Sequence, residues 1–204
     1  MLTTRYKSLL NARLEPVAAR LARLGVAPSA LTLAGPVLTG LVCLWFVQRR
    51  AVVPFCLAMA AVGCLDGLDG AVARASGRVT RFGAYLDAVC DRYVDVMVVL
   101  AAAYVTGYWA LSLAALAGAL LVSYAKARAA MEVPVSNLEW PDLMERTERS
   151  VLFGAGLVAG AVLPWRPLGH DLFWWALLLL AVLTHGTVLQ RILRARRFIQ
   201  ERNK

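Results

Sequence analysis

Long apolar stretches alternate with short charged ones along the chain. Six of these stretches predict helices, at residues 31–48, 51–73, 82–106, 108–128, 150–163 and 172–193. A helix that crosses a bilayer needs about 20 predominantly apolar residues, and several of the six reach that length. The pattern predicts an all-α integral membrane protein with six transmembrane helices.

The N-terminal segment, residues 2–24, has a different pattern. Its leucines recur at helical spacing, and its basic residues fall mostly between them. This amphipathic pattern predicts a helix that lies on the membrane surface. Gly25 and Pro28 end this predicted helix, and Ser29 is placed to cap the next helix. We expect one domain over residues 1–204, made of a juxtamembrane amphipathic helix (1–28), a six-helix bundle (29–195) and a basic cytoplasmic tail (196–204).

Composition and charge agree with a membrane protein. Hydrophobic residues make up 60% of the chain, whereas soluble domains are usually about 45–50% apolar. Of the 22 lysines and arginines, only Arg49, Arg50 and Arg166 fall in the predicted outer loops. Basic residues concentrate on the cytoplasmic side, so we expect both termini to face the cytoplasm in the cell membrane. The net charge of +9 favours contact with anionic lipid headgroups, and we expect no nucleic-acid partner.

The cysteines and histidines carry little chemistry. Cys43, Cys56, Cys64 and Cys90 all lie inside or at the edge of apolar stretches. They show neither metal-ligand spacing nor a disulfide framework, so we expect small core residues. The two histidines, at positions 170 and 185, have no evident role.

Aspartates gather where the second predicted span ends and the third begins. Asp66 and Asp69 are three residues apart, and Asp87 and Asp91 are four apart. Each pair therefore shares one face of its helix. The link between the two helices is short, so we expect antiparallel neighbours whose four carboxylates converge near the cytoplasmic side. Asp95 continues the second face as a helper or a structural residue.

Such a cluster needs a cation. An aspartate deep in a membrane helix costs about 2.5–3.5 kcal/mol, and four carboxylates also repel one another. Divalent cations that prefer oxygen ligands, Mg²⁺ or Mn²⁺, fit best, because no histidine or cysteine is placed to form a zinc site. Two such ions suit phosphoryl transfer. The alternative is ion pairing with Arg74, Arg78 and Arg81.

Glycines lie beside the acids. Gly67, Gly70 and Gly83 allow a backbone to come close to a bulky ligand such as a nucleotide or pyrophosphate. Arg74 is one turn beyond Gly70 and can hold a phosphate with two hydrogen bonds. The alternative for each glycine is close helix packing, which is common in membranes.

The whole stretch resembles the signature of the CDP-alcohol phosphotransferase family, D-x2-D-G-x2-A-R-x8-G-x3-D-x3-D. All eight fixed positions and all the gaps agree. The matching residues are Asp66, Asp69, Gly70, Ala73, Arg74, Gly83, Asp87 and Asp91.

The resemblance implies a metal-dependent transfer of a phosphatidyl-type group from a CDP-linked lipid, such as CDP-diacylglycerol, to a polar alcohol, with release of CMP. Asp91 would be the general base on the acceptor hydroxyl, and the family also implies a homodimer. The implied metal ligands are Asp66, Asp69, Asp87 and Asp91. The residues expected around the CDP moiety are Asp69, Gly70, Ala73, Arg74 and Gly83.

A second basic set suggests the acceptor. Residues 81–92, 123–128 and 145–149 resemble those of bacterial phosphatidylinositol phosphate synthases and their archaeal counterparts. That resemblance assigns an inositol phosphate site to Lys126, Arg146, Arg149 and Arg191. Ordinary positive-inside charge is the alternative for each residue. The connection 129–145 carries several acids that can alter acceptor choice, so glycerol 3-phosphate and serine stay open as acceptors.

Two hypotheses of other classes stand beside the enzyme. A small cation transporter or channel could use the acidic cluster as an ion path. However, the acids gather at one membrane face, and the sequence shows no inverted repeat. A non-catalytic scaffold is disfavoured because every signature acid is present.

Overall fold

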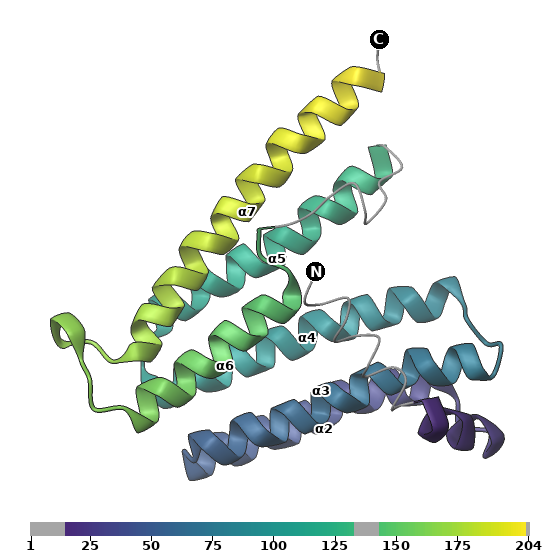
Figure 1. The fold of residues 1–204 in the computed structure, drawn as a ribbon, viewed down its shortest axis with the longest axis horizontal. Helices are drawn as coiled ribbons and strands as arrows, with labels where there is room; N and C mark the ends of the chain where they lie inside the picture. The colour runs from purple at the N-terminus through teal and green to yellow at the C-terminus, as the bar shows by residue number, and fades with distance from the viewer. Residues whose placement is uncertain (1–14, 133–142, 203–204) are drawn as a thin grey trace. The chain divides into compact units, whose positions relative to one another are not determined.

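The computed structural model of the protein describes residues 15–132 and 143–202. All regular structure in these ranges is helical. A helical segment at residues 15–23 is followed by α2 (Pro28–Arg49), α3 (Val52–Ala75), α4 (Arg81–Thr106), α5 (Trp109–Glu132), α6 (Arg146–Val162), the 3-10 helix η1 (Pro167–Gly169) and α7 (Leu172–Arg202) (Figure 1). The chain divides into two compact units, Met1–Val105 and Thr106–Lys204.

The predicted all-α membrane class is confirmed by four helices that are long and apolar enough to cross a membrane. They are Pro28–Arg49, Val52–Ala75, Trp109–Glu132 and Leu172–Gln200. Helices α4 and α6 occupy the other two predicted spans, but α4 carries several charged residues and α6 has only 17 residues. Six spans therefore stay a prediction, as does the single domain. Of the predicted surface helix, residues 2–14 lie outside the described ranges.

Large apolar side chains of α2 face outward in a continuous stripe. Leu33, Val37, Leu41 and Leu44 are each more than half exposed. Their spacing places them on one side of the helix. A stripe of this kind is unusual on a water-soluble surface and fits contact with lipid.

The first unit is organised around α3. α2 packs along it, and the turn between them is closed by Phe46 and Phe55, whose rings stack with centroids 4.0 Å apart. The helical segment 15–23 buries Ala18 against Leu68 and Val72 of α3. α4 returns antiparallel to α3, as predicted (Figure 1), although its backbone does not follow α3 as closely as that of α2 does.

Two helix starts differ from the sequence prediction. α2 begins at Pro28 after Ala27 as the N-cap residue, without a side-chain cap, so the prediction of a Ser29 cap was wrong. Proline suits the first helical position, where no backbone donor is needed. α6 begins at Arg146, earlier than expected, because the side chains of Glu145 and Glu148 form a capping box.

None of the four cysteines, which all lie in the described ranges, forms a disulfide bond. Cys43 and Cys90 are buried and Cys56 is intermediate, but Cys64 is exposed. The prediction of a core position was therefore wrong for Cys64.

In the second unit, α7 packs against both α5 and α6. Small residues allow the close approach. A Cβ at Gly118 would overlap the Thr184 side chain, and a Cβ at Gly160 would lie only 2.8 Å from the Cβ of Phe173. Glycines that let a neighbouring helix approach closely are typical of helices that pack in membranes.

The start of α7 is fixed by Asp171. Its Oδ1 accepts the backbone N–H of Trp174 at 3.0 Å, and its Oδ2 accepts the Tyr108 hydroxyl at 2.8 Å. Burial, together with this hydrogen bond and the nearby Asp171 charge, raises the pKa of Tyr108, although Arg166 opposes the shift. The carboxylate thus caps one helix and ties it to the start of α5.

Replacing Gly156 with alanine is expected to destabilise the second unit. The new Cβ would overlap the Cβ of Ala176, and neither group can move without shifting a helix. Overpacking of this kind costs about 1–3 kcal/mol. Thermal unfolding in detergent measures the loss. The control is Gly154→Ala in the same helix, where a Cβ meets nothing within 4 Å; equal melting temperatures for the two variants would contradict the packing argument.

Candidate active site

The signature residues lie at the ends of two consecutive helices of the first unit. Asp66, Asp69 and Arg74 belong to the last turns of α3, and Asp87 and Asp91 to the first turns of α4. Residues 76–80 join the two helices. The helical placement predicted from the spacing is therefore confirmed for both halves of the signature.

Asp69 is a buried carboxylate. The residue is only 8% exposed to solvent. Oδ2 accepts the Thr32 hydroxyl at 2.5 Å, and Oδ1 accepts the backbone N–H of Gly70 at 2.5 Å. No lysine or arginine in the described ranges forms an ion pair with it. A buried carboxylate is costly without a compensating cation, so this position fits a metal ligand.

Two of the acids of α4 form ion pairs with an arginine of their own helix. The Nη2 atom of Arg92 lies 3.6 Å from Oδ2 of Asp91, and its Nε atom lies 3.6 Å from Oδ2 of Asp95. The alternative prediction was pairing with Arg74, Arg78 and Arg81. None of these three arginines forms an ion pair with a side chain that the structure describes, so that alternative loses its support.

The donors fit a hard divalent cation by their chemistry, because all four predicted ligands are carboxylates. Among the side chains described, no three acidic, histidine or cysteine residues lie close enough together to hold one ion. The Asp66 side chain is outside that set. The convergence of four carboxylates on metal ions therefore stays a prediction.

Both glycines that are predicted to bind CDP, Gly70 and Gly83, have a polar side-chain atom close to the backbone. A Cβ at Gly70 would lie 3.3 Å from Nη1 of Arg74, so the bare backbone leaves room for that guanidinium. Gly83 donates its backbone N–H to the Thr80 hydroxyl at 2.9 Å, and a Cβ there would lie 3.1 Å from the same oxygen. Gly83 thus serves the start of α4 as well as any ligand.

The predicted acceptor residues all lie in the second unit, on three helices. Arg149 and Arg191 are buried, at 9% and 5% exposure. Arg149 donates from Nη1 to the Met144 carbonyl at 3.0 Å, and Arg191 donates from Nη1 to the Val122 carbonyl. The second contact fixes the α7 guanidinium on α5, one turn before Lys126. Arg146 lies in the first turn of α6, three residues before Arg149.

Comparison with known proteins decides the family. Residues 25–185 match the sequence profile of the family described as CDP-alcohol phosphatidyltransferase. The chain belongs to this family. The predicted resemblance is thereby confirmed, and a CDP-alcohol phosphatidyltransferase is an enzyme of phosphatidyl transfer.

Relatives of the family cover almost the whole chain. An archaetidylinositol phosphate synthase of Pyrococcus horikoshii is 32% identical over 190 residues, which are 92% of this chain and 93% of the relative. A phosphatidylinositol phosphate synthase of Corynebacterium glutamicum is 34% identical over 191 residues, which are 89% of this chain and 83% of the relative.

Solved structures of the Mycobacterium tuberculosis phosphatidylinositol phosphate synthase have the same fold. The structure with CDP-DAG bound has a TM-score of 0.78 and 28% identity, covering 89% of this chain and 92% of that one. The complex with manganese and citrate also has a TM-score of 0.78 and 28% identity, covering 89% and 88%.

Sequence reasoning missed Thr32 in this CDP-alcohol phosphatidyltransferase. The residue is 37 positions from Asp69, is buried at 6% exposure, and donates to the carboxylate. Its hydroxyl also lies 3.2 Å from the Pro28 carbonyl oxygen. The only signal in the sequence was a polar residue at the start of an apolar span. Thr32 fixes the orientation of a predicted metal ligand from a neighbouring helix.

Replacing Thr32 with valine is expected to raise the metal concentration needed for half-maximal CMP release by roughly 10- to 100-fold. The reason is that a metal ligand that loses its outer hydrogen-bond partner is poorly oriented. The measurement is CMP release against Mg²⁺ or Mn²⁺ concentration. The matched control is Thr39→Val in the same helix. Thr39 is fully buried, and its hydroxyl has no hydrogen-bond partner among the described residues. An unchanged metal requirement in Thr32→Val would remove the positioning role.

Proposed function

We propose that this enzyme transfers the phosphatidyl group of CDP-diacylglycerol to inositol phosphate and releases CMP. The observation that carries the choice of acceptor is the set of basic residues in the second unit, with Arg149 and Arg191 buried. Guanidinium groups bind phosphate with paired hydrogen bonds. The relatives named as synthases of inositol phosphate lipids support the same acceptor.

We assign the binding of the donor lipid, CDP-diacylglycerol, to the residues of the family signature. Its CDP moiety binds among Asp69, Gly70, Ala73, Arg74 and Gly83. Arg74 supplies a positive charge for the pyrophosphate, and the space above Gly70 already accommodates its guanidinium. The manganese complex of the structural neighbour supports metal dependence.

Asp66, Asp69, Asp87 and Asp91 would hold two divalent ions, Mg²⁺ or Mn²⁺. When bound, such ions neutralise the pyrophosphate and stabilise the departing CMP. Asp69 is prepared for this role because Thr32 and the Gly70 N–H already fix its two oxygens.

The chemistry is a substitution at phosphorus. The acceptor hydroxyl oxygen forms a bond to the lipid-bearing phosphorus, and the bond from that phosphorus to the bridging oxygen breaks. CMP leaves with the bonding electron pair. Asp91 takes the proton of the hydroxyl as general base. Arg92, whose Nη2 lies 3.6 Å from Oδ2 of Asp91, is placed to orient the carboxylate for this step.

The membrane arrangement follows from the charge pattern. We propose that α4 and α6 cross the bilayer together with the four apolar helices, and that residues 1–28 lie on its surface. Both termini and the active site then face the cytoplasm, where the basic residues concentrate. The whole chain works as one domain in a homodimer, as the family resemblance implies.

The test is an acceptor panel on purified protein with CDP-diacylglycerol and Mg²⁺. CMP release is expected with inositol phosphate and to be absent without an acceptor. Release with glycerol 3-phosphate or serine instead would keep the chemistry and change the acceptor. A cation channel, the alternative of another class, has no reason to bind CDP-diacylglycerol or CMP, so lack of binding by folded protein would overturn the enzyme.

Within that assay, Arg191→Gln is expected to raise the KM for inositol phosphate by roughly 10- to 100-fold, because a hydrogen bond to a charged group is lost. The KM for CDP-diacylglycerol should stay unchanged. The control is Arg128→Gln on α5, an exposed arginine whose partner is Glu132 at 2.6 Å. An equal rise in both KM values would indicate a structural effect and contradict an acceptor role.

A further inference from the structure

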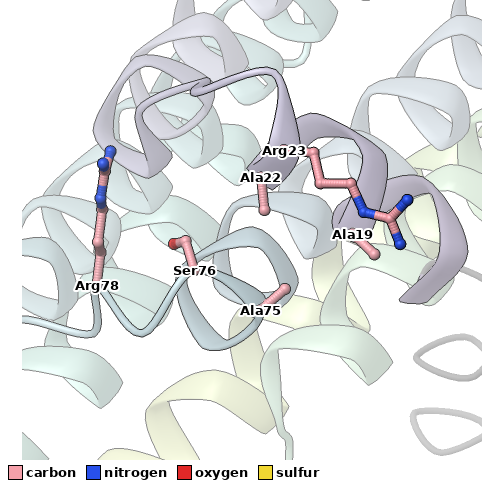
Figure 2. Close-up of a pocket in the computed structure, with 6 residues that line it drawn as sticks. All are labelled: Ala19, Ala22, Arg23, Ala75, Ser76 and Arg78. Atoms are coloured by element: carbon pink, nitrogen blue, oxygen red, sulfur yellow. The ribbon is translucent and has the colours of Figure 1, made fainter.

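A pocket of about 440 Å³ lies between the helical segment 15–23 and the end of α3 (Figure 2). Small residues form its floor, and one arginine stands on each side of it, Arg23 from the segment and Arg78 from the link to α4. The lining residues are Ala19, Ala22, Arg23, Ala75, Ser76 and Arg78. None of them belongs to the family signature, so the pocket is distinct from the predicted CDP-binding residues.

Among the lining residues that the structure describes, the two guanidinium groups are the only polar donors not already used in a hydrogen bond. The Ser76 hydroxyl donates to the Val72 carbonyl at 2.7 Å. The backbone N–H groups of Ser76 and Arg78 donate to carbonyls of the last α3 turn. Within the described ranges, neither Arg23 nor Arg78 forms an ion pair. None of the six lining residues is acidic.

Two arginines without acidic partners around a pocket with an apolar floor suit an anion. Guanidinium groups match the oxygen geometry of phosphate. The pocket volume lies in the range of sites that bind small organic ligands, and it is larger than the volume that a bare ion occupies. A phosphate group that carries a small polar or glycerol substituent therefore fits the space and the charge.

We propose that this pocket binds the phosphate group of an anionic lipid headgroup. The proposal rests on the membrane arrangement given above. There the segment 15–23 lies at the bilayer surface, and Ala75 and Ser76 end a membrane-spanning helix. Ala18 and Leu21 of the segment contact the apolar part of α3, which leaves the pocket at the polar end of that contact, at the depth of lipid headgroups.

Occupation of the pocket has a consequence for the enzyme. Ala75 and Ser76 directly follow Arg74 on α3, and Ala71 and Val72 of the same helix contact the segment 15–23. A bound headgroup therefore joins the surface segment to the helix end that carries Asp69 and Arg74. We expect an anionic lipid to stabilise this helix end in the absence of substrate.

The test measures lipid binding by native mass spectrometry without CDP-diacylglycerol or acceptor. The probes are short-chain phosphatidylglycerol, short-chain phosphatidylcholine and inorganic phosphate. Phosphatidylglycerol is expected to bind best. The double substitution Arg23→Gln and Arg78→Gln should weaken its binding about 30-fold, since each basic residue near a membrane contributes about a fivefold factor. The matched control carries Arg49→Gln and Arg50→Gln, which removes the same charge elsewhere.

The lipid probes and inorganic phosphate together distinguish a lipid headgroup from a free phosphate ion as the ligand. Equal phosphatidylglycerol affinity in the wild type and the Arg23/Arg78 variant would overturn the site. Displacement of the lipid by an equal concentration of inorganic phosphate would overturn the lipid assignment and indicate a soluble phosphate instead. Because no donor or acceptor is present, failure here leaves the acceptor panel unaffected.

Discussion

Replacing Asp91 with asparagine is expected to slow CMP release by about 10²–10⁴-fold, the usual contribution of a positioned general base. Asparagine keeps the size of the side chain and removes the group that accepts the proton of the acceptor hydroxyl. Residues assigned to CDP on α3 are untouched, so binding of CDP-diacylglycerol should persist. The measurements are CMP release at saturating metal and acceptor, and donor binding in the same preparation.

The matched control is Asp95→Asn. Asp95 lies one turn further along α4, and Arg92 is 3.6 Å from both Asp91 and Asp95. If Asp91 acted only as a partner for Arg92, the two substitutions would have similar effects. A large loss in Asp91→Asn with a small loss in Asp95→Asn supports the general base. Equal losses, or a loss that extra metal restores, would assign Asp91 another role.

The helices could be predicted because lipid imposes a simple rule on the sequence. Apolar runs bounded by glycine, proline or charge mark helices, and each predicted run has a helix in the structure. The boundaries were less predictable. α6 begins with charged residues that a hydropathy pattern assigns to a loop, and its capping box, Glu145 with Glu148, was not recognised. α7 continues through Arg196 and Arg197, which the sequence suggested as a tail.

The site could be predicted as far as local spacing reaches. Asp87 and Asp91 share a face because four residues are about one helical turn. The contact between Thr32 and Asp69 could not be predicted, because it depends on how α2 packs along α3. The ion pairs of Arg92 are local by contrast, because Asp91 is its chain neighbour and Asp95 lies three residues further along the same helix, so their spacing was available from the sequence. Packing between helices is the information that a single sequence lacks.

Removal of divalent metal is expected to abolish CMP release, and Mg²⁺ or Mn²⁺ should restore it. The physical reason is Asp69, whose buried carboxylate has two hydrogen-bond donors but no cationic side chain among the described residues. A buried negative charge without a cation is strongly unfavourable. A bound ion supplies the missing charge, so the metal should stabilise the folded protein as well as the reaction.

Stability therefore provides a readout that does not depend on turnover. A ligand present at about 100 times its Kd stabilises the folded state by about 2.7 kcal/mol. Chelation should lower the melting temperature of the wild type accordingly, and the shift should shrink in Asp69→Asn because the carboxylate ligand is gone. The control Asp171→Asn, which changes the residue that caps α7, should keep the full metal response. Full activity after complete chelation would contradict the metal assignment. If the metal-dependent shift in melting temperature persisted unchanged in Asp69→Asn, the ion would bind at other ligands, because the loss of this carboxylate would then not have weakened metal binding.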